Sequence, residues 1–187
     1  MKTKEKTTIL EKGMKVLAFA ASSSKKSINK QLVTHAVSLI DGADSEVLDI
    51  NDYELPLFST DREEELGHPE KAQEFFNKIG ECDALVISFA EHNGSYAAAY
   101  KNLFDWASRI NQKVFQGKKM VLLATSPGPG GAKNVLASAS ASCPHFNGDL
   151  KASLSIPSFF DNFDGEAGVL TNEALSAELA EAMNLLR

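Results

Sequence analysis

Residues 14–29 read MKVLAFAASSSKKSIN and set the pattern for most of the chain. The stretch 14–21 is apolar on both of its faces, which is typical of a strand buried inside a parallel sheet. A loop of small polar residues follows at 22–27. From Ile28 to about Asp41, apolar residues recur at helical spacing. This strand–loop–helix unit predicts an α/β fold.

The same alternation continues to the end of the chain. Further strands are predicted at 46–50, 84–89, 119–125 and 150–156. Further helices are predicted from Pro69 through Ile79 and at 96–110, 132–142 and 170–186. Five strands that alternate with helices predict one parallel sheet covered on both faces. We expect a single domain over 14–187, preceded by a mobile extension at 1–13. Residues 51–68 show no periodicity and are predicted to form a long excursion, with the acidic run at 61–65 as a solvated loop.

Composition limits the possible partners. The 187 residues carry a net charge of −6, and 43% of them are apolar, as in an ordinary globular protein. An acidic chain disfavours nucleic acid and anionic membranes as partners. No apolar run approaches the ~20 residues that a transmembrane helix needs. The two cysteines form no CxxC motif, which predicts a reduced, cytoplasmic protein. The four histidines are scattered without the spacing of a metal site, so no metal is expected.

Ligands of such sheets bind beyond the carboxyl ends of the strands, at the point where the strand order reverses. The loops after the first, third and fourth strands are therefore the candidate site. The first loop offers serine hydroxyls and an amide directly before a helix, whose N-terminus attracts anions. These candidate residues are Ser22, Ser24, Ser27, Ile28 and Asn29. The pattern fits a phosphate monoester, with Lys25 and Lys26 as nearby charges. Helix capping by Ser27 or Asn29 is the alternative.

The second loop contains an Asn-Gly pair, which favours a tight turn that tolerates positive φ. Such a turn can direct backbone groups at a heterocycle, and Ser95 can cap the next helix. The candidate residues are Glu91, His92, Asn93, Gly94 and Ser95. The helix predicted at 96–110 has apolar residues on two faces, with Tyr100 on one and Trp106 on the other. Either it contacts another subunit or it is deeply buried.

The third loop is rich in glycine and proline. Its candidate residues are Ser126, Pro127, Gly128, Gly130 and Gly131. Small residues let a flat ring approach the backbone closely, whereas a flexible turn is the plain alternative. No GxSxG motif is present, so Ser95 and Ser126 are poor candidates for a nucleophile. The first loop is neither a Walker A loop nor a GxGxxG loop.

Together these segments resemble the NADPH-dependent FMN reductase family of flavodoxin-like proteins, which includes quinone, azo-dye and chromate reductases. Its first loop typically reads GSxRxxSxN and aligns with residues 21–29. Its second typically reads PEYNGS and is followed by KNxxDW, which aligns with Lys101, Asn102, Asp105 and Trp106. Its third loop is similar to 126–131. The sequence departs from the family where Ser24 replaces arginine, Ala90 replaces proline and His92 replaces tyrosine.

The resemblance implies a three-layer sandwich with strand order 2-1-3-4-5, and an FMN-dependent NAD(P)H oxidoreductase. FMN would place its phosphate on the first loop and its ring between the second and third. NADPH or NADH and a small-molecule acceptor, such as a quinone or free flavin, would react in turn by a ping-pong cycle. A homo-oligomer formed through the 96–110 helix is also expected. The alternatives are a flavodoxin-like electron carrier and a flavin-free binding or regulatory module.

Overall fold

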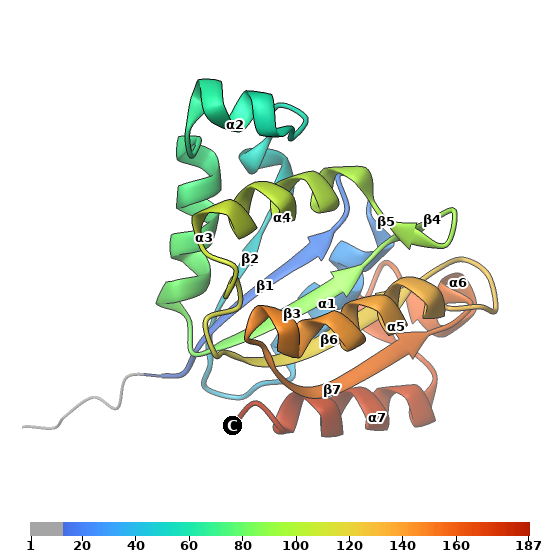
Figure 1. Ribbon diagram of the computed structural model, residues 1–187. Helices are drawn as coiled ribbons and strands as arrows, with labels where there is room; N and C mark the ends of the chain where they lie inside the picture. Colours follow the sequence, from blue (N-terminus) through green and yellow to red (C-terminus); the bar gives the residue numbers. More distant parts are fainter. Residues whose placement is uncertain (1–12) are drawn as a thin grey trace, which may run out of the picture.

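The computed structural model describes residues 13–187, so the extension predicted at 1–13 lies, except for Gly13, outside the described residues. Five parallel strands form the central sheet in the order β2-β1-β3-β6-β7 (Figure 1). Their bounds are β1 Lys15–Ala21, β2 Asp44–Leu48, β3 Ala84–Phe89, β6 Lys119–Thr125 and β7 Asp149–Ile156. The predicted five-stranded parallel sheet and its strand order are therefore confirmed.

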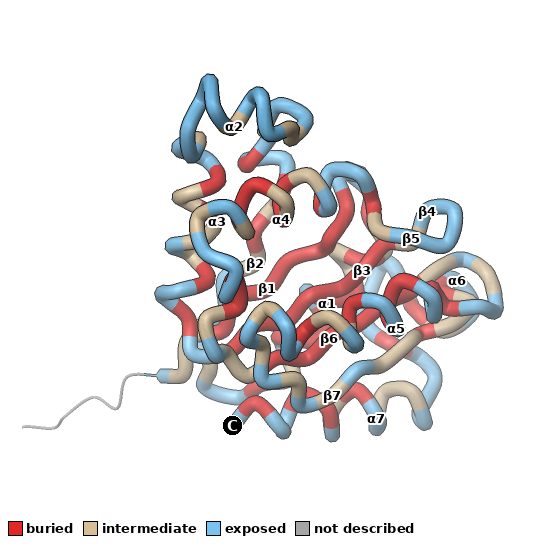
Figure 2. Tube along the Cα trace, in the orientation of Figure 1, coloured by how far each residue is buried: buried red, intermediate tan, exposed pale blue. Residues whose placement is uncertain are grey.

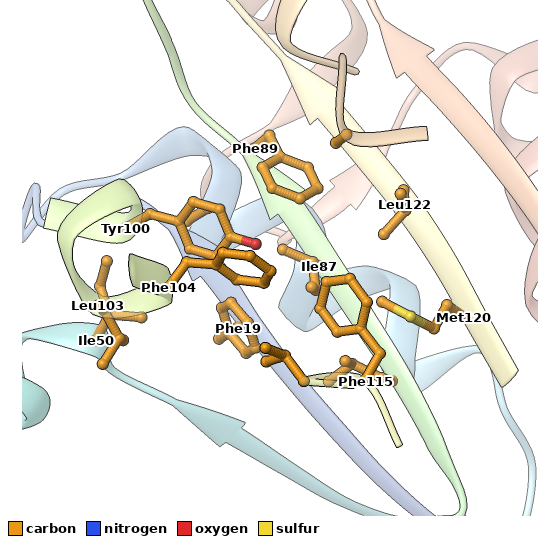
Figure 3. Packing of buried hydrophobic residues seen from close by; sticks show 14 of the residues in the cluster. Phe19, Ile50, Ile87, Phe89, Tyr100, Leu103, Phe104, Phe115, Met120 and Leu122 are labelled. Atoms are coloured by element: carbon orange, nitrogen blue, oxygen red, sulfur yellow. The ribbon is translucent and has the colours of Figure 1, made fainter. Parts of the chain in front are cut away.

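Side-chain alternation along the central strands feeds two separate hydrophobic cores. In β1, Leu17 and Phe19 point to one face, and Val16 and Ala18 point to the other. Every residue of β3 is buried, as expected for a strand covered on both sides. Aromatic rings dominate the core that contains Phe19 (Figure 3).

Helices cover both faces of the sheet and bury their apolar sides against it. One face is covered by α1 (Ile28–Ser38) and α7 (Glu173–Asn184), and the other by α3 (Glu70–Glu81), α4 (Ala98–Ile110) and α5 (Lys133–Ser142). Figure 2 shows the buried interior along the strands and the exposed outer sides of the helices. Within residues 13–187, none of the helices combines the length and the apolar character needed to cross a bilayer.

The excursion at 51–68 is more regular than predicted. It holds a 3-10 turn, η1 (Ile50–Tyr53), and a short helix, α2 (Thr60–Leu66). The solvated loop predicted at 61–65 is therefore wrong: these residues are helical, although none is buried. Ser59 caps the helix by accepting from the N–H of Arg62 at 3.1 Å, and Gly67 ends it at a φ of +66°. A helix without a buried face has no apolar periodicity by which the sequence could reveal it.

Smaller elements also differ from the prediction. The second loop folds into a hairpin, β4 (Glu91–His92) with β5 (Ser95–Tyr96), and a second hairpin pairs β8 (Phe163–Asp164) with β9 (Val169–Leu170). A 3-10 turn, η2 (Cys143–Phe146), and a one-turn helix, α6 (Phe159–Asn162), flank β7. The closing helix begins at Glu173 rather than 170, because Asn172 caps it.

Both cysteines are buried free thiols, which yields a direct test of the core. Burial raises the pKa of Cys143 to about 11, and burial also raises the pKa of Cys82. Because the thiolate is the reactive form, neither should react with Ellman's reagent in the folded protein at pH 7.5. Both should react after unfolding in guanidinium, as measured by the released thionitrobenzoate. Rapid reaction of the folded protein would contradict this burial.

Candidate functional site

The three candidate loops leave the sheet at one level. In the strand register, Ala21 at the end of β1 lies opposite Phe89 at the end of β3, which lies opposite Ala124 in β6. The loops that follow these strands therefore begin side by side at the same edge (Figure 1). The predicted convergence of the three loops is confirmed at the level of the backbone.

The first loop turns tightly into α1. The N–H of Ser27 donates to the carbonyl of Ser24 at 3.1 Å, and the N–H of Ser24 donates to Ser22 Oγ at 3.3 Å. Ser27 caps α1, since its hydroxyl accepts from the N–H of Lys30 at 3.3 Å. The capping interpretation is thus correct for Ser27. Capping does not exclude phosphate binding, because a hydroxyl that accepts one hydrogen bond can still donate another.

Asn29 is not a cap but the centre of a buried polar network. Its side chain is only 2% exposed. Its Oδ1 accepts from the N–H of Thr125 at 3.1 Å and from Ser88 Oγ at 2.8 Å, and its Nδ2 donates to the carbonyl of Thr125 at 3.3 Å. Thr125 Oγ1 continues the network to the carbonyl of Ile156 at 2.7 Å. The amide of Asn29 therefore ties the start of α1 to the ends of β3, β6 and β7.

The second loop is a two-residue hairpin with Asn93 and Gly94 at its tip. Their φ angles of 52° and 76° are both left-handed, as a type I′ turn requires, so the predicted tight turn is confirmed. The predicted cap at Ser95 is wrong: Ser95 pairs with His92 across the hairpin, and α4 starts only at Ala98. The hairpin delays the helix because its second strand must first return to the sheet edge.

Glu91 anchors this hairpin to the helix after the third loop. Its Oε2 accepts from the N–H of Val135 at 2.8 Å, and its Oε1 accepts from Asn134 Nδ2 at 3.4 Å. Both partners lie in the first turn of α5, where unpaired N–H groups and the helix dipole favour a carboxylate. The predicted site residue Glu91 thus fixes the second loop relative to the third.

The third loop is held by the segment that follows β7. Carbonyls of Ser126 and Gly128 accept from the N–H groups of Phe159 and Ser158, at 3.0 and 2.9 Å. Gly131 has a φ of +59°, and its carbonyl accepts from Ser155 Oγ at 2.6 Å. Gly131 therefore serves packing against β7, whereas Gly128 and Gly130 have open space where a Cβ would lie.

A groove of about 240 Å³ lies where the three loops meet. It brings together all five predicted residues of the first loop and part of the other two loops: Ser22, Ser24, Ser27, Ile28, Asn29, Glu91, His92, Ser126 and Pro127. Six predicted residues do not line it: Asn93, Gly94, Ser95, Gly128, Gly130 and Gly131. The groove also includes Ala90 and Thr125, which the prediction missed although both adjoin predicted residues, and Lys26, which the sequence offered only as a nearby charge.

Gly131 provides a test of how the third loop is built. A Cβ at this position would overlap Ser155 Oγ and lie 3.1 Å from the backbone of Pro157, at a φ that strains any other residue. Gly131→Ala should lower the free energy of unfolding by about 1–3 kcal/mol in urea titrations. The matched control, Gly130→Ala, enters open space and should stay within about 0.5 kcal/mol of the wild type. Equal effects of both changes would contradict this geometry.

Two residues of the KNxxDW motif bind the excursion to α4. Asn102 Nδ2 donates to the carbonyls of Leu55 and Pro56, each at 3.1 Å, and Asn102 Oδ1 accepts from the N–H of Phe58 at 2.8 Å. Trp106 Nε1 donates to the same carbonyl of Pro56 at 2.7 Å. The sequence suggested no hydrogen bonds for these side chains, because their partners lie more than forty residues away.

The excursion also explains the second apolar face of α4. Trp106 is completely buried, and the ring of Phe58 packs edge-on against it at 5.1 Å between centroids. On the other face, Tyr100 and Leu103 pack into the sheet core. The wide apolar stripe is therefore accounted for within one chain. Self-association through this helix stays a prediction, which the mass of the protein in solution would test.

A parallel sheet of this order, with a polar groove at the carboxyl ends of β1, β3 and β6, defines a flavodoxin-like α/β protein. The chain belongs to the NADPH-dependent FMN reductase family, whose model matches residues 14–152.

Relatives and solved structures agree with this assignment. An NAD(P)H-dependent FMN reductase of Pseudomonas aeruginosa is 34% identical over 116 residues, which are 62% of this chain and 61% of that protein. An NADPH:quinone oxidoreductase of Arabidopsis thaliana is 32% identical over 134 residues, which are 70% of this chain and 67% of that protein. The match thus spans about six tenths to two thirds of these relatives. Among solved structures, the flavoenzyme NAD(P)H:(acceptor) oxidoreductase FerB of Paracoccus denitrificans superposes with a TM-score of 0.72 at 25% identity, covering 92% of this chain and 97% of that one.

Proposed function

We propose that the chain is an FMN-dependent NAD(P)H oxidoreductase that reduces quinones, free flavin or similar small acceptors. The observation that carries this proposal is the single groove at which the loops after β1, β3 and β6 meet. The relatives named as FMN and quinone reductases support the same activity.

The groove suits a phosphate monoester that carries a flat ring. Along its first-loop side it offers the hydroxyls of Ser24 and Ser27, the N-terminal N–H groups of α1 and the ammonium group of Lys26. On the side of the other two loops it offers Ala90, His92 and Pro127, whose carbon surfaces can contact a ring. A group with an anionic tail and an apolar head therefore matches both sides of the groove.

The protein's own contribution is binding and orientation. Bound FMN would supply the two-electron redox chemistry, which no side chain in the groove can supply. The Asn29 network holds the first and third loops together, and the carboxylate of Glu91 holds the second loop against α5. We further propose that NAD(P)H and the acceptor use the same open side of the groove in turn. Double-reciprocal plots of initial rate against NAD(P)H concentration, measured at several fixed acceptor concentrations, should then give parallel lines.

Lys26 is proposed to replace the arginine that the family has at the position of Ser24. Lys26 lines the groove, whereas the neighbouring Lys25 does not. Lys26→Gln should weaken FMN binding by about 1 kcal/mol, or about fivefold, because a charge-assisted contact with the phosphate is lost from an exposed site. Lys25→Gln is the control and should change affinity less than twofold. Fluorescence titration with FMN measures both, and equal losses would remove Lys26 from the phosphate site.

Two measurements test the proposed function itself. The purified protein, with FMN added if needed, should show the visible bands of a bound flavin. It should also oxidise NADPH or NADH steadily when a quinone is present. A protein that binds no FMN would be a flavin-free module, and one that binds FMN without turnover would be an electron carrier. Either result would overturn the proposal.

A further inference from the structure

A partly open aromatic cavity lies apart from the groove, between α4 and α5. Its volume is about 220 Å³. Most of its wall is apolar and comes from β3, β5, α4, β6, α5 and η2. The apolar and tyrosine residues that line it are Phe89, Tyr96, Tyr100, Phe104, Phe115, Leu122, Ala139 and Phe146. None of these residues lines the groove, so the cavity is a separate space.

The rings of the wall contact one another and leave the cavity between them. Tyr100 meets Phe89 edge-on at 5.3 Å between centroids, and Phe104 meets Phe146 edge-on at 4.7 Å. Polar side chains on α4 also belong to the lining. Lys101 and Asp105 pair with each other at 2.7 Å, and Ser108 donates to the carbonyl of Asp105 at 2.8 Å. These groups already have partners, so none of them needs a hydrogen bond from a ligand in the cavity.

One polar group on the cavity wall has no protein partner within residues 13–187. Tyr100 is 4% exposed, and none of the side-chain hydrogen bonds of the described residues involves its hydroxyl. Figure 3 shows this hydroxyl directed into the space bounded by Phe89, Phe104 and Leu122. Burial raises the pKa of Tyr100 well above its ordinary value, so the hydroxyl stays neutral and can donate. A hydroxyl on the cavity wall without a protein partner can donate a hydrogen bond to a ligand that carries an acceptor.

We propose that this cavity binds a small single-ring aromatic molecule that accepts a hydrogen bond from Tyr100. The size agrees, since an apolar protein cavity of about 150 Å³ holds one benzene ring. The lining agrees as well, because aromatic rings prefer edge-to-face and offset contacts with another ring. A phenol is the simplest molecule with both features. The site goes beyond the proposed oxidoreductase activity and does not depend on it.

The test uses the purified full chain, with phenol and toluene as probes, and follows the Ala139 methyl signal by NMR. The wild type should bind both probes. Tyr100→Phe keeps the ring and removes the hydroxyl, so phenol should bind about fivefold more weakly while toluene stays within twofold. Ala139→Leu fills the cavity and should abolish binding of both probes, as followed by saturation transfer to the probe. Ala137→Leu, on the exposed side of the same helix, should change neither.

Several results would overturn the proposal. If the wild type binds neither probe, the cavity is closed in solution or filled by a second copy of the chain. If Tyr100→Phe binds phenol as the wild type does, the hydroxyl takes no part. If Ala139→Leu folds and still binds, or if the probes perturb the bound-flavin spectrum and leave Ala139 unmoved, they bind elsewhere. Should Ala139→Leu fail to fold, Ala139→Val fills the cavity less and must weaken the binding of both phenol and toluene.

Discussion

Replacing Trp106 with alanine is expected to lower the free energy of unfolding by about 3–5 kcal/mol, the range for removing a fully buried tryptophan. Its ring is completely buried and supports the ring of Phe58. Its Nε1 also donates to the carbonyl of Pro56 at 2.7 Å, and this bond is lost with the ring. Urea titration followed by circular dichroism measures the change.

The same variant should also release the excursion. With Trp106 absent, the hydrogen bonds that still join the 55–58 segment to α4 within the described residues are those of Asn102. Limited proteolysis should therefore cut this segment faster in Trp106→Ala than in the wild type. Trp106→Phe is the control, because it keeps most of the apolar contact and loses only the hydrogen bond. It should lose about 1–2 kcal/mol. A loss below about 1 kcal/mol in Trp106→Ala would show that the segment does not depend on this ring.

Replacing Asn29 with alanine should lower the free energy of unfolding by about 3 kcal/mol, because it leaves buried polar groups without hydrogen-bond partners. The N–H of Thr125 and the hydroxyl of Ser88 would both lose their acceptor. Both residues are at most 1% exposed, so water cannot easily replace the lost bonds. Because the first and third loops would no longer be tied, we also expect FMN affinity to fall by about tenfold or more.

Two single changes separate the causes in this prediction. Ser88→Ala removes one partner of Asn29 and should lower the free energy of unfolding by about 1 kcal/mol. Ser27→Ala removes the cap of α1 and should have a similar effect. If Asn29→Ala is no more destabilising than Ser88→Ala or Ser27→Ala, the hydrogen bonds around Asn29 are not cooperative. If the FMN affinity of Asn29→Ala equals that of the wild type, these hydrogen bonds stabilise the sheet edge without shaping the groove.

The sequence by itself predicted the parallel sheet and the place of the site, because both depend on local patterns. Continuous apolar runs such as 84–89 indicate strands buried on both faces. Small and polar residues after three of these strands indicated the edge at which a groove forms. The left-handed turn at Asn93 and Gly94 could also be predicted, since its geometry follows from those two residues.

Errors arose where an element has no buried face or where a partner is distant. The helix α2 buries nothing, so its acidic sequence looked like a loop. Ser95 was predicted to cap a helix because a serine before a helical pattern usually does, but the hairpin takes this residue instead. Gly131 was assigned to a ligand, whereas its neighbour is Ser155 on the adjacent strand.

Tertiary structure alone decided what the individual site residues do. Asn29 reads locally as a cap or a ligand, yet its amide joins segments that lie 59 and 96 residues away. Glu91 reads as a ligand, yet its carboxylate holds the start of α5. A strand follows from the periodicity of its own residues, whereas a side chain's role depends on which distant groups the sheet register brings to it. That register exists only once the chain has folded.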